Sequence, residues 1–175
     1  MSVSDTIYTV KNILILDDEG KRIAARYYTS EFPTLEEQRA FEVRLFEKTR
    51  RNRSEIVMLD NSVIVYRIKM DCFLYVSGSS DENELILYSV LACLHESISQ
   101  LLRHAVEKHS LLENLDYVLL AIDEIVDRGI ILDADWESIT GKVAMKGAEA
   151  EVPIGEQTIS QALKIARDQF LTLAN

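Results

Sequence analysis

Three strand-like segments follow one another between residues 55 and 77, with very short connections. They are Glu55–Leu59, Val63–Met70 and Cys72–Ser77, each dominated by β-branched, aromatic and other apolar residues. A parallel crossover needs a dozen or more residues, so connections this short allow only antiparallel pairing. Asp60–Asn61 has the composition of a tight turn between the first two segments. The region therefore predicts an antiparallel meander.

A second pair of strands precedes this meander. Tyr8–Leu16 is rich in β-branched and aromatic residues, and Ile23–Tyr28 is the returning strand. Asp17–Gly20 lies between them and has the residues of a hairpin connection. These segments predict a β-hairpin at the beginning of the domain.

The stretch between the hairpin and the meander predicts a helix. Pro33 and Thr34 stand at its start, and Glu36 and Glu37 place negative charge in the first turn, where the helix dipole favours it. Its far end is the basic stretch Lys48–Arg53. The residues expected on its buried side are Leu35, Phe41, Leu45 and Phe46.

After residue 83 the apolar residues recur every three or four positions instead of every second one, which indicates helices. A long helix is predicted over Asn83–Lys108 and a second one over Leu112–Val126. Arg128–Gly129 closes the second helix, because glycine best tolerates a left-handed cap. The apolar stripe of the long helix consists of Leu87, Leu91, Leu94, Ile98, Leu101 and Ala105, widened by Ile86, Val90 and Cys93.

The predicted order is ββαβββαα, an α/β (α+β) arrangement in which a five-stranded antiparallel sheet is flanked by helices. We assign this core to residues 1–130 and a C-terminal extension to residues 131–175. The extension is expected to hold a short helix at Asp135–Met145, a linker at Lys146–Pro153 and an amphipathic helix at Thr158–Leu173. This order is typical of longin-like domains, also described as SNARE-like or profilin-like.

The composition is that of one globular domain. The 175 residues are 47% hydrophobic and 27% charged, and the net charge is -10. This negative charge disfavours nucleic acid and direct binding to an anionic membrane, so any membrane association is expected to be indirect. Cys72 and Cys93 lie in apolar contexts and are expected to be reduced core residues. We find no secretion signal and no run that could span a bilayer, and we expect a cytoplasmic protein.

The sequence offers no catalytic, cofactor-binding or metal-binding constellation, so we do not expect an enzyme. The nearest metal signature is His95–Ser99, but the zinc-binding pattern needs a second histidine where Ser99 stands. His104 and His109 lie too far along the chain to complete three facing ligands. The glycine-rich motifs that cradle phosphates do not occur, and no cofactor is predicted.

Two groups of charged residues are candidates for a partner interface. The basic group stands out in an acidic chain, and its members are Arg44, Lys48, Arg50, Arg51 and Arg53. It is either a favourable positive charge at a helix C-terminus or a contact with an acidic partner groove or lipid phosphates. The acidic group is Asp123 and Asp127, whose charge opposes the dipole near a helix end. The acidic group either forms a solvated polar face or contacts a partner.

Several stretches together carry a family resemblance; they are Tyr8–Asp17, Gly78–Leu85, Ala121–Asp127 with Gly129–Leu132, and Glu156–Gln161. In combination they resemble the coatomer zeta subunits and, more loosely, the small chains of clathrin adaptors. The resemblance implies a non-catalytic coat subunit cradled by the helical-repeat trunk of the gamma coat subunit, its direct partner. It also implies assembly with the other coatomer subunits in a coat that an Arf-family GTPase recruits to Golgi membranes for retrograde transport.

The looser resemblance to adaptor small chains implies an alternative, a clathrin-type adaptor subunit that binds acidic dileucine sorting signals. The corresponding seam, between a central strand and the long helix, lies around Met70, Cys72, His95 and His104. Two histidines are poor walls for leucine side chains, and Ile23 stands where a basic side chain is expected for the signal's acidic residue. Direct binding of such signals is therefore not expected, and the seam is interpreted as vestigial.

Overall fold

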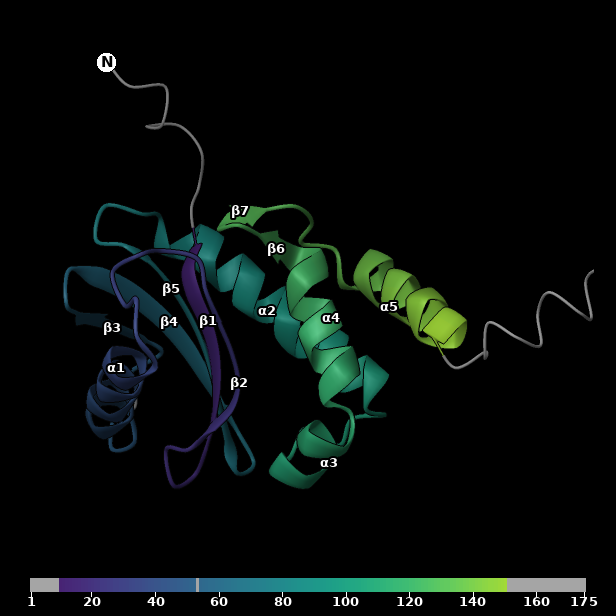
Figure 1. Cartoon of the computed structure of the whole chain (residues 1–175), viewed down its shortest axis with the longest axis horizontal. Coiled ribbons are helices and arrows are strands. Elements are labelled where there is room, and N and C mark those ends of the chain that lie inside the picture. The colour runs from purple at the N-terminus through teal and green to yellow at the C-terminus, as the bar shows by residue number, and fades with distance from the viewer. Residues whose placement is uncertain (1–9, 53, 151–175) are drawn as a thin grey trace, which may run out of the picture. The chain divides into compact units, whose positions relative to one another are not determined.

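The computed structural model describes residues 10–52 and 54–150, and its centre is a five-stranded antiparallel sheet (Figure 1). The strands are β1 (Val10–Asp17), β2 (Arg22–Tyr27), β3 (Ile56–Leu59), β4 (Ser62–Lys69) and β5 (Cys72–Ser79). Their order across the sheet is β2-β1-β5-β4-β3. The predicted hairpin and the predicted meander are both present, and the pairing of β1 with β5 joins them.

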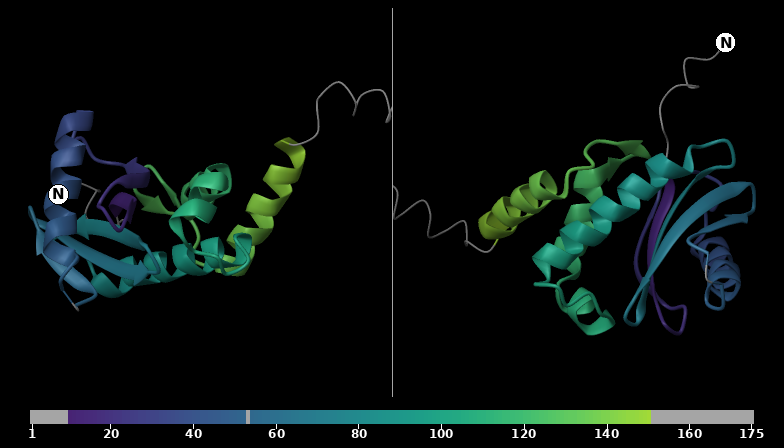
Figure 2. Two further views of the ribbon diagram at one scale, coloured as in Figure 1. Left: turned by 90° about the horizontal axis from the view of Figure 1, so that it is seen from below. Right: turned by 180° about the vertical axis from the view of Figure 1, so that it is seen from behind.

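Helices cover both faces of the sheet. Helix α1 (Leu35–Thr49) lies on one face, and α2 (Glu84–Leu101) and α4 (Leu115–Ile125) lie on the other, as the two views of Figure 2 show. The short helix α3 (Lys108–Glu113) connects α2 to α4. The chain continues through a small hairpin of β6 (Val126–Asp127) and β7 (Ile130–Ile131) to α5 (Trp136–Ala150).

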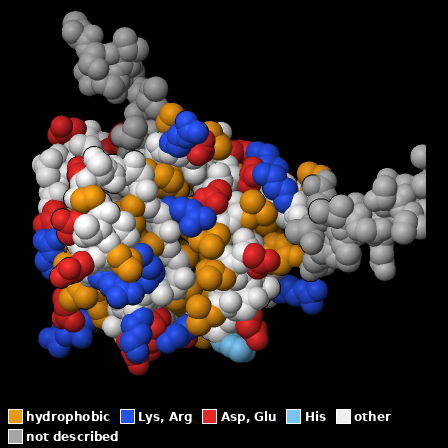
Figure 3. Space-filling model, in the orientation of Figure 1, with side chains coloured by type: hydrophobic (Ala, Val, Ile, Leu, Met, Phe, Trp, Pro, Cys, Tyr) orange, Lys and Arg blue, Asp and Glu red, His pale blue; other side chains and the backbone are white. Residues whose placement is uncertain are grey.

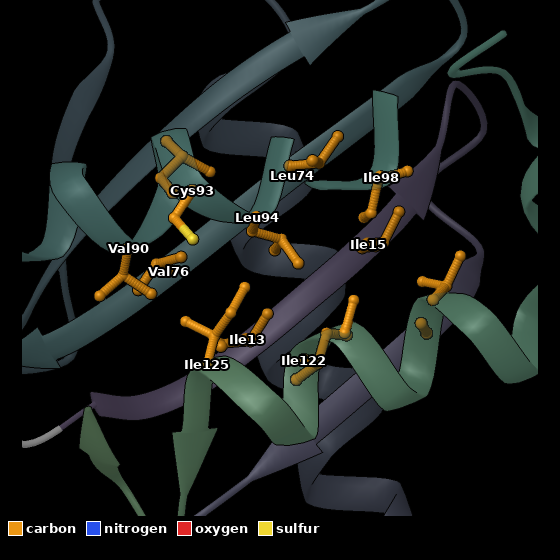
Figure 4. Packing of buried hydrophobic residues seen from close by; sticks show 14 of the residues in the cluster. Ile13, Ile15, Leu74, Val76, Val90, Cys93, Leu94, Ile98, Ile122 and Ile125 are labelled. Atoms are coloured by element: carbon orange, nitrogen blue, oxygen red, sulfur yellow. The ribbon is translucent and has the colours of Figure 1, made fainter. Parts of the chain in front are cut away.

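The sheet divides the core into two clusters because successive strand residues point to opposite faces. Toward α2 and α4, Ile13 and Ile15 of β1 and Leu74 and Val76 of β5 pack against the helices (Figure 4). Toward α1, the intervening residues meet a set of aromatic rings. That second cluster contains Leu14, Leu16, Phe41, Leu45, Phe46, Tyr66, Phe73 and Tyr75. Both central strands are therefore buried on both faces.

Helix α1 begins at the position that the sequence predicts, but one residue of its buried side was assigned wrongly. Thr34 caps the helix: its Oγ1 accepts a hydrogen bond from the backbone N–H of Glu37, whose carboxylate accepts one from the backbone N–H of Thr34. Phe41, Leu45 and Phe46 are buried as predicted. Leu35, in contrast, is 52% exposed. It lies one turn before Arg39 and two turns before Val43, on the side of the helix that faces away from the sheet, where both of those residues are also exposed.

The long helix ends earlier than predicted, at Leu101 instead of Lys108. Arg103 and His104 take positive φ angles of 52° and 70°, and the backbone N–H of His104 donates to the carbonyl of Ser99 at 2.6 Å. Ala105, which was placed in the apolar stripe, is exposed in this turn. The reversal returns the chain to the core, where Val106 is buried. The predicted helix over Leu112–Val126 is present as α4, separated from α3 at Asn114.

The C-terminal part departs further from the sequence-based expectation. The predicted helix end at Arg128–Gly129 is wrong: α4 ends at Ile125, where Val126 is extended, and Gly129, with a φ of 85°, lies instead in the turn of the β6–β7 hairpin. Helix α5 runs to Ala150 and so occupies the first part of the expected linker. The described residues up to Val143 form one compact unit, which extends past residue 130 because Ile139 and Val143 are buried in the core. The predicted helix at Thr158–Leu173 lies outside the described residues.

The loops at one end of the sheet are fastened to the start of α3 by two buried or partly buried aspartates. Asp17 is 1% exposed, and its carboxylate accepts from the backbone N–H groups of Glu19 (3.0 Å) and Lys21 (2.7 Å) and from Lys108 Nζ (2.7 Å). Asp71 accepts from the backbone N–H of Lys108 at 2.9 Å. Burial alone would raise the pKa of Asp17, but the hydrogen bonds from Lys108 and the two backbone groups outweigh it and lower the pKa.

A first prediction concerns Gly20, at the tip of the β1–β2 hairpin. Its φ is 78°, and a Cβ placed there would lie 2.6 Å from Cδ1 of Phe46. We expect Gly20→Ala to lower the free energy of unfolding by about 2 kcal/mol, through backbone strain and overpacking against the ring. The matched control is Gly141→Ala in α5, where an added Cβ meets nothing within 4 Å. It should raise stability by about 0.5–1 kcal/mol. Urea unfolding measures the change in the free energy of unfolding of both variants, and the two changes should have opposite signs. Equal changes would contradict the close contact between Gly20 and Phe46.

A second prediction concerns the pH dependence of stability at Asp17. Because its pKa is lower in the folded chain than the ordinary value of 3.8, the ionised carboxylate stabilises the fold above that value. This contribution is lost as the pH falls through the lowered pKa. Asp17→Asn should therefore lower the Tm by roughly 2–4 °C at pH 7, and the difference from the wild type should shrink below pH 3.8. Asp18→Asn, at the exposed neighbouring position, is the control and should leave the Tm at pH 7 close to that of the wild type.

Candidate interaction surfaces

The metal-ligating side chains of the described residues do not gather in one place. Among residues 10–52 and 54–150, no group of three or more His, Cys, Asp or Glu side chains is placed to hold a metal ion. Cys72 and Cys93 are free, buried thiols, and burial raises the pKa of both. Since the thiolate is the reactive form, these cysteines are structural residues of the core. The predicted charged groups and the predicted seam are the remaining candidate sites.

Two members of the predicted basic group bind other parts of the same fold. The guanidinium of Arg44 forms a bidentate pair with the carboxylate of Asp60, with N–O distances of 3.0 and 2.7 Å. Lys48 Nζ donates to the backbone carbonyl of Met58. Both contacts connect α1 to β3 and the turn that follows it. These partners could not be predicted from the sequence, because they lie more than two helical turns away along the chain.

The remaining members of the basic group differ in exposure and pairing. Arg50 forms an ion pair with Glu47 at 2.9 Å, one turn earlier on α1. Arg51 is exposed and makes no ion pair with any described residue. Arg53 lies outside the described residues. The prediction that this group contacts a partner stays a prediction, and within it Arg51 has the charge most accessible to one.

The outward face of α1 carries two residues that sequence analysis did not single out, Arg39 and Val43. They line a cleft between α1 and the β1–β2 hairpin, together with Gly20, Lys21, Arg22 and Glu42. Glu42 is only 3% exposed, and its carboxylate binds the guanidinium of Arg22 at 2.6 Å and accepts from the Tyr27 hydroxyl at 3.0 Å. This pair, in which the Glu42 carboxylate is buried, fixes the hairpin against the helix. The four-residue spacing of Leu35, Arg39 and Val43 was the signal that could have revealed this face.

The predicted acidic group also contributes to internal contacts. Asp123 of α4 forms a bidentate pair with Arg26 of β2, with N–O distances of 2.8 and 2.9 Å, and this hydrogen bonding raises the pKa of Arg26. Asp127 is exposed in β6 and lies on the same groove as Asp123 and Arg128. Asp123 thus ties α4 to the edge of the sheet, and contact of either residue with a partner stays a prediction.

The four residues of the predicted sorting-signal seam do not form one exposed surface. Met70 is 75% exposed at the β4–β5 turn, whereas Cys72 is fully buried in the core. His104 is exposed in the turn after α2, where its Nδ1 lies 3.1 Å from the hydroxyl of Ser99. His95 is 8% exposed on the middle of α2. An elongated apolar ligand would therefore not meet these four side chains along one groove.

The contact between α2 and β4 near His95 is occupied by polar side chains. Nδ1 of His95 lies 3.2 Å from a guanidinium nitrogen of Arg67 and 3.0 Å from a carboxylate oxygen of Glu96. Arg67 also donates to the hydroxyl of Tyr88 at 2.8 Å and stacks over its ring. This network joins β4 to α2. The expectation that the seam does not bind leucine side chains stays a prediction.

Comparison with known proteins gives one consistent family. Residues 9–150 match the family model of the clathrin adaptor complex small chain. Coatomer subunit zeta-1 of Homo sapiens is 49% identical, over 94% of this chain and 92% of the human protein. Coatomer subunit zeta-2 of Arabidopsis thaliana is 46% identical, over 95% of each chain.

A structural comparison agrees with the sequence relatives. A chain in a homology model of the full-length AP-3 complex in a stretched open conformation has a TM-score of 0.65 to this structure, with 17% identity. The match covers 87% of this chain and 98% of that chain, and at this identity it supports the fold alone. Together with the sequence matches, it confirms the predicted longin-like α/β fold of an adaptor small chain. The chain belongs to the coatomer zeta subunits, within the family of clathrin adaptor small chains.

Proposed function

We propose that this chain is the non-catalytic small subunit of the coatomer vesicle coat and binds directly to the trunk of the gamma coat subunit. Through this pairing it assembles with the other coatomer subunits, which an Arf-family GTPase recruits to Golgi membranes. The coat supports Golgi-to-ER and intra-Golgi vesicle transport, and the chain is cytoplasmic and peripheral on Golgi membranes and coated vesicles. The observation that carries the proposal is the identity of nearly one half with coatomer zeta subunits over almost the whole chain.

The surface of the structure supports a role in assembly. Large hydrophobic side chains are exposed on several elements, among them Val43 of α1, Met58 of β3 and Leu112 of α3, each about half exposed. Figure 3 shows that hydrophobic side chains also gather in a band over α4, between charged groups. Exposed apolar surface rimmed by charge is typical of protein–protein contacts. A large partner subunit would cover such surface.

The charge of the chain supports indirect membrane attachment. A net charge of -10 is unfavourable next to anionic lipids. Among the described residues, no helix is long and apolar enough to cross a bilayer. In the proposed function the partner subunits and the GTPase therefore hold the chain at the membrane.

The test is affinity purification of the tagged full-length chain from cytosol, with the same tag on an unrelated acidic protein as control. We expect a gamma-type coat subunit to be recovered in equal amount, accompanied by the other coatomer subunits. Recovery of clathrin adaptor large chains would instead support the adaptor alternative and direct attention to the network around His95. Recovery of the chain without any companion would contradict both functions.

A further inference from the structure

A group of buried polar side chains lies at the end of the sheet where β1 begins and β5 ends. Its members are Lys11 and Asn12 of β1, Ser62 of β4 and Ser77 of β5, and each is at most 9% exposed. The backbone register places Asn12 directly opposite Ser77. A polar atom that is buried without a hydrogen bond costs free energy, so nearly all such atoms in folded proteins have a partner. Each side chain of this group therefore needs one.

A β-bulge in β1 turns Lys11 and Asn12 toward the face of the sheet that carries α1. Val10 and Ile13 both belong to the core cluster under α2 and α4, on the opposite face. The register with β5 shifts between Val10 and Asn12, which leaves one extra residue in β1. The two residues between Val10 and Ile13 therefore share the other face, as the residues of a bulge can.

Ser77 lies beside Asn12 on this same face. Along β5 it alternates with Phe73 and Tyr75, whose rings belong to the cluster under α1. Side chains directly opposite each other in antiparallel strands have their Cβ atoms about 5 Å apart, so those of Asn12 and Ser77 are neighbours. A serine also fills less of this face than the two rings do. The end of the sheet is thus lined by small polar groups where the rest of the face is aromatic.

The side chain of Lys11 reaches from β1 past β5 to β4. Its ammonium group donates to Ser62 Oγ at 3.2 Å and to the carbonyl of Asn61 at 3.4 Å, and it pairs with the carboxylate of Glu31 at 2.8 Å. Glu31 belongs to the segment between β2 and α1. In the same segment, the backbone N–H of Tyr28 donates to the carbonyl of Lys11 at 2.9 Å. These contacts hold the segment against the end of the sheet and balance the charge of the ammonium group.

Three oxygen atoms in this region are buried and have no hydrogen-bond partner among the described residues. They are Oδ1 of Asn12, Oγ of Ser77 and Oγ1 of Thr29. Thr29 directly follows Tyr28, whose backbone is bonded to Lys11, so it lies next to this end of β1. All three oxygens are uncharged. Uncharged polar atoms that gather inside a fold are the usual partners of an internal water molecule, which needs about two to four of them.

We propose that an ordered internal water molecule bridges Asn12, Ser77 and Thr29 beneath the segment that leads into α1. The water donates to Oδ1 of Asn12 and bonds with the two hydroxyl groups, each of which can turn to donate or to accept. Water fits this place better than an ion, because the ammonium group of Lys11 is already balanced by Glu31. The water joins β1, β5 and the segment after β2, and it thereby contributes to the placement of α1. This inference does not depend on the proposed function.

The first test is a crystal structure of the full-length chain at a resolution that shows ordered waters. We expect density for a water molecule within about 2.7–3.2 Å of both the amide oxygen of Asn12 and the hydroxyl oxygen of Ser77. Well-ordered side chains without such density would overturn the proposal. Direct hydrogen bonds from these two groups to other protein atoms would overturn it as well.

Thermal unfolding of Ser77→Ala tests the same site by the sign of its effect. The substitution removes a single oxygen atom, so the variant should keep the fold. If the hydroxyl holds a water, its loss should lower the Tm by about 2–4 °C. If the hydroxyl has no partner at all, removing it should leave the Tm unchanged or raise it, and this result would overturn the proposal. The control is Tyr66→Phe, which removes another buried hydroxyl without a partner among the described residues, outside this group, and should not lower the Tm.

Discussion

The pairing of β1 with β5 is the contact on which the rest of the structure depends. It joins a hairpin from the start of the chain to a meander that follows α1, and it runs from Val10 beside Gly78 to Asp17 beside Cys72. This register places Ile13 and Leu74 on the side of α2 and α4, and Leu14 and Tyr75 on the side of α1. A shift of one residue would exchange the two faces and bury each strand against the wrong helices.

The same pairing fixes the loops that shape the surface. Because β1 ends beside the start of β5, Asp17 and Asp71 both reach Lys108 at the beginning of α3. The β1–β2 hairpin is thereby held at its base, and the pair of Arg22 and Glu42 fastens it to α1. The geometry of the cleft beside Val43 is in this way a consequence of how the central strands are paired.

Local sequence rules predicted the elements well where local chemistry decides them. The antiparallel meander followed from connection lengths, and the start of α1 from Thr34 and Glu37. The same rules failed to predict the end of α2, since no glycine or proline stands between Leu101 and Lys108 to mark the turn. There the burial of Val106 and the bond from Lys108 to Asp71 determine the path, and both are long-range effects.

The candidate surfaces show the same limit more strongly. A run of charges in the sequence does not reveal which members bind within the fold, because Arg44 meets Asp60 and Asp123 meets Arg26 only after folding. Contact of the predicted groups with a partner therefore stays a prediction, although Arg44 and Asp123 bind other residues of the same fold. Arg39 and Val43 were missed because neither is unusual in sequence. They stand out only when exposure and pairing are known.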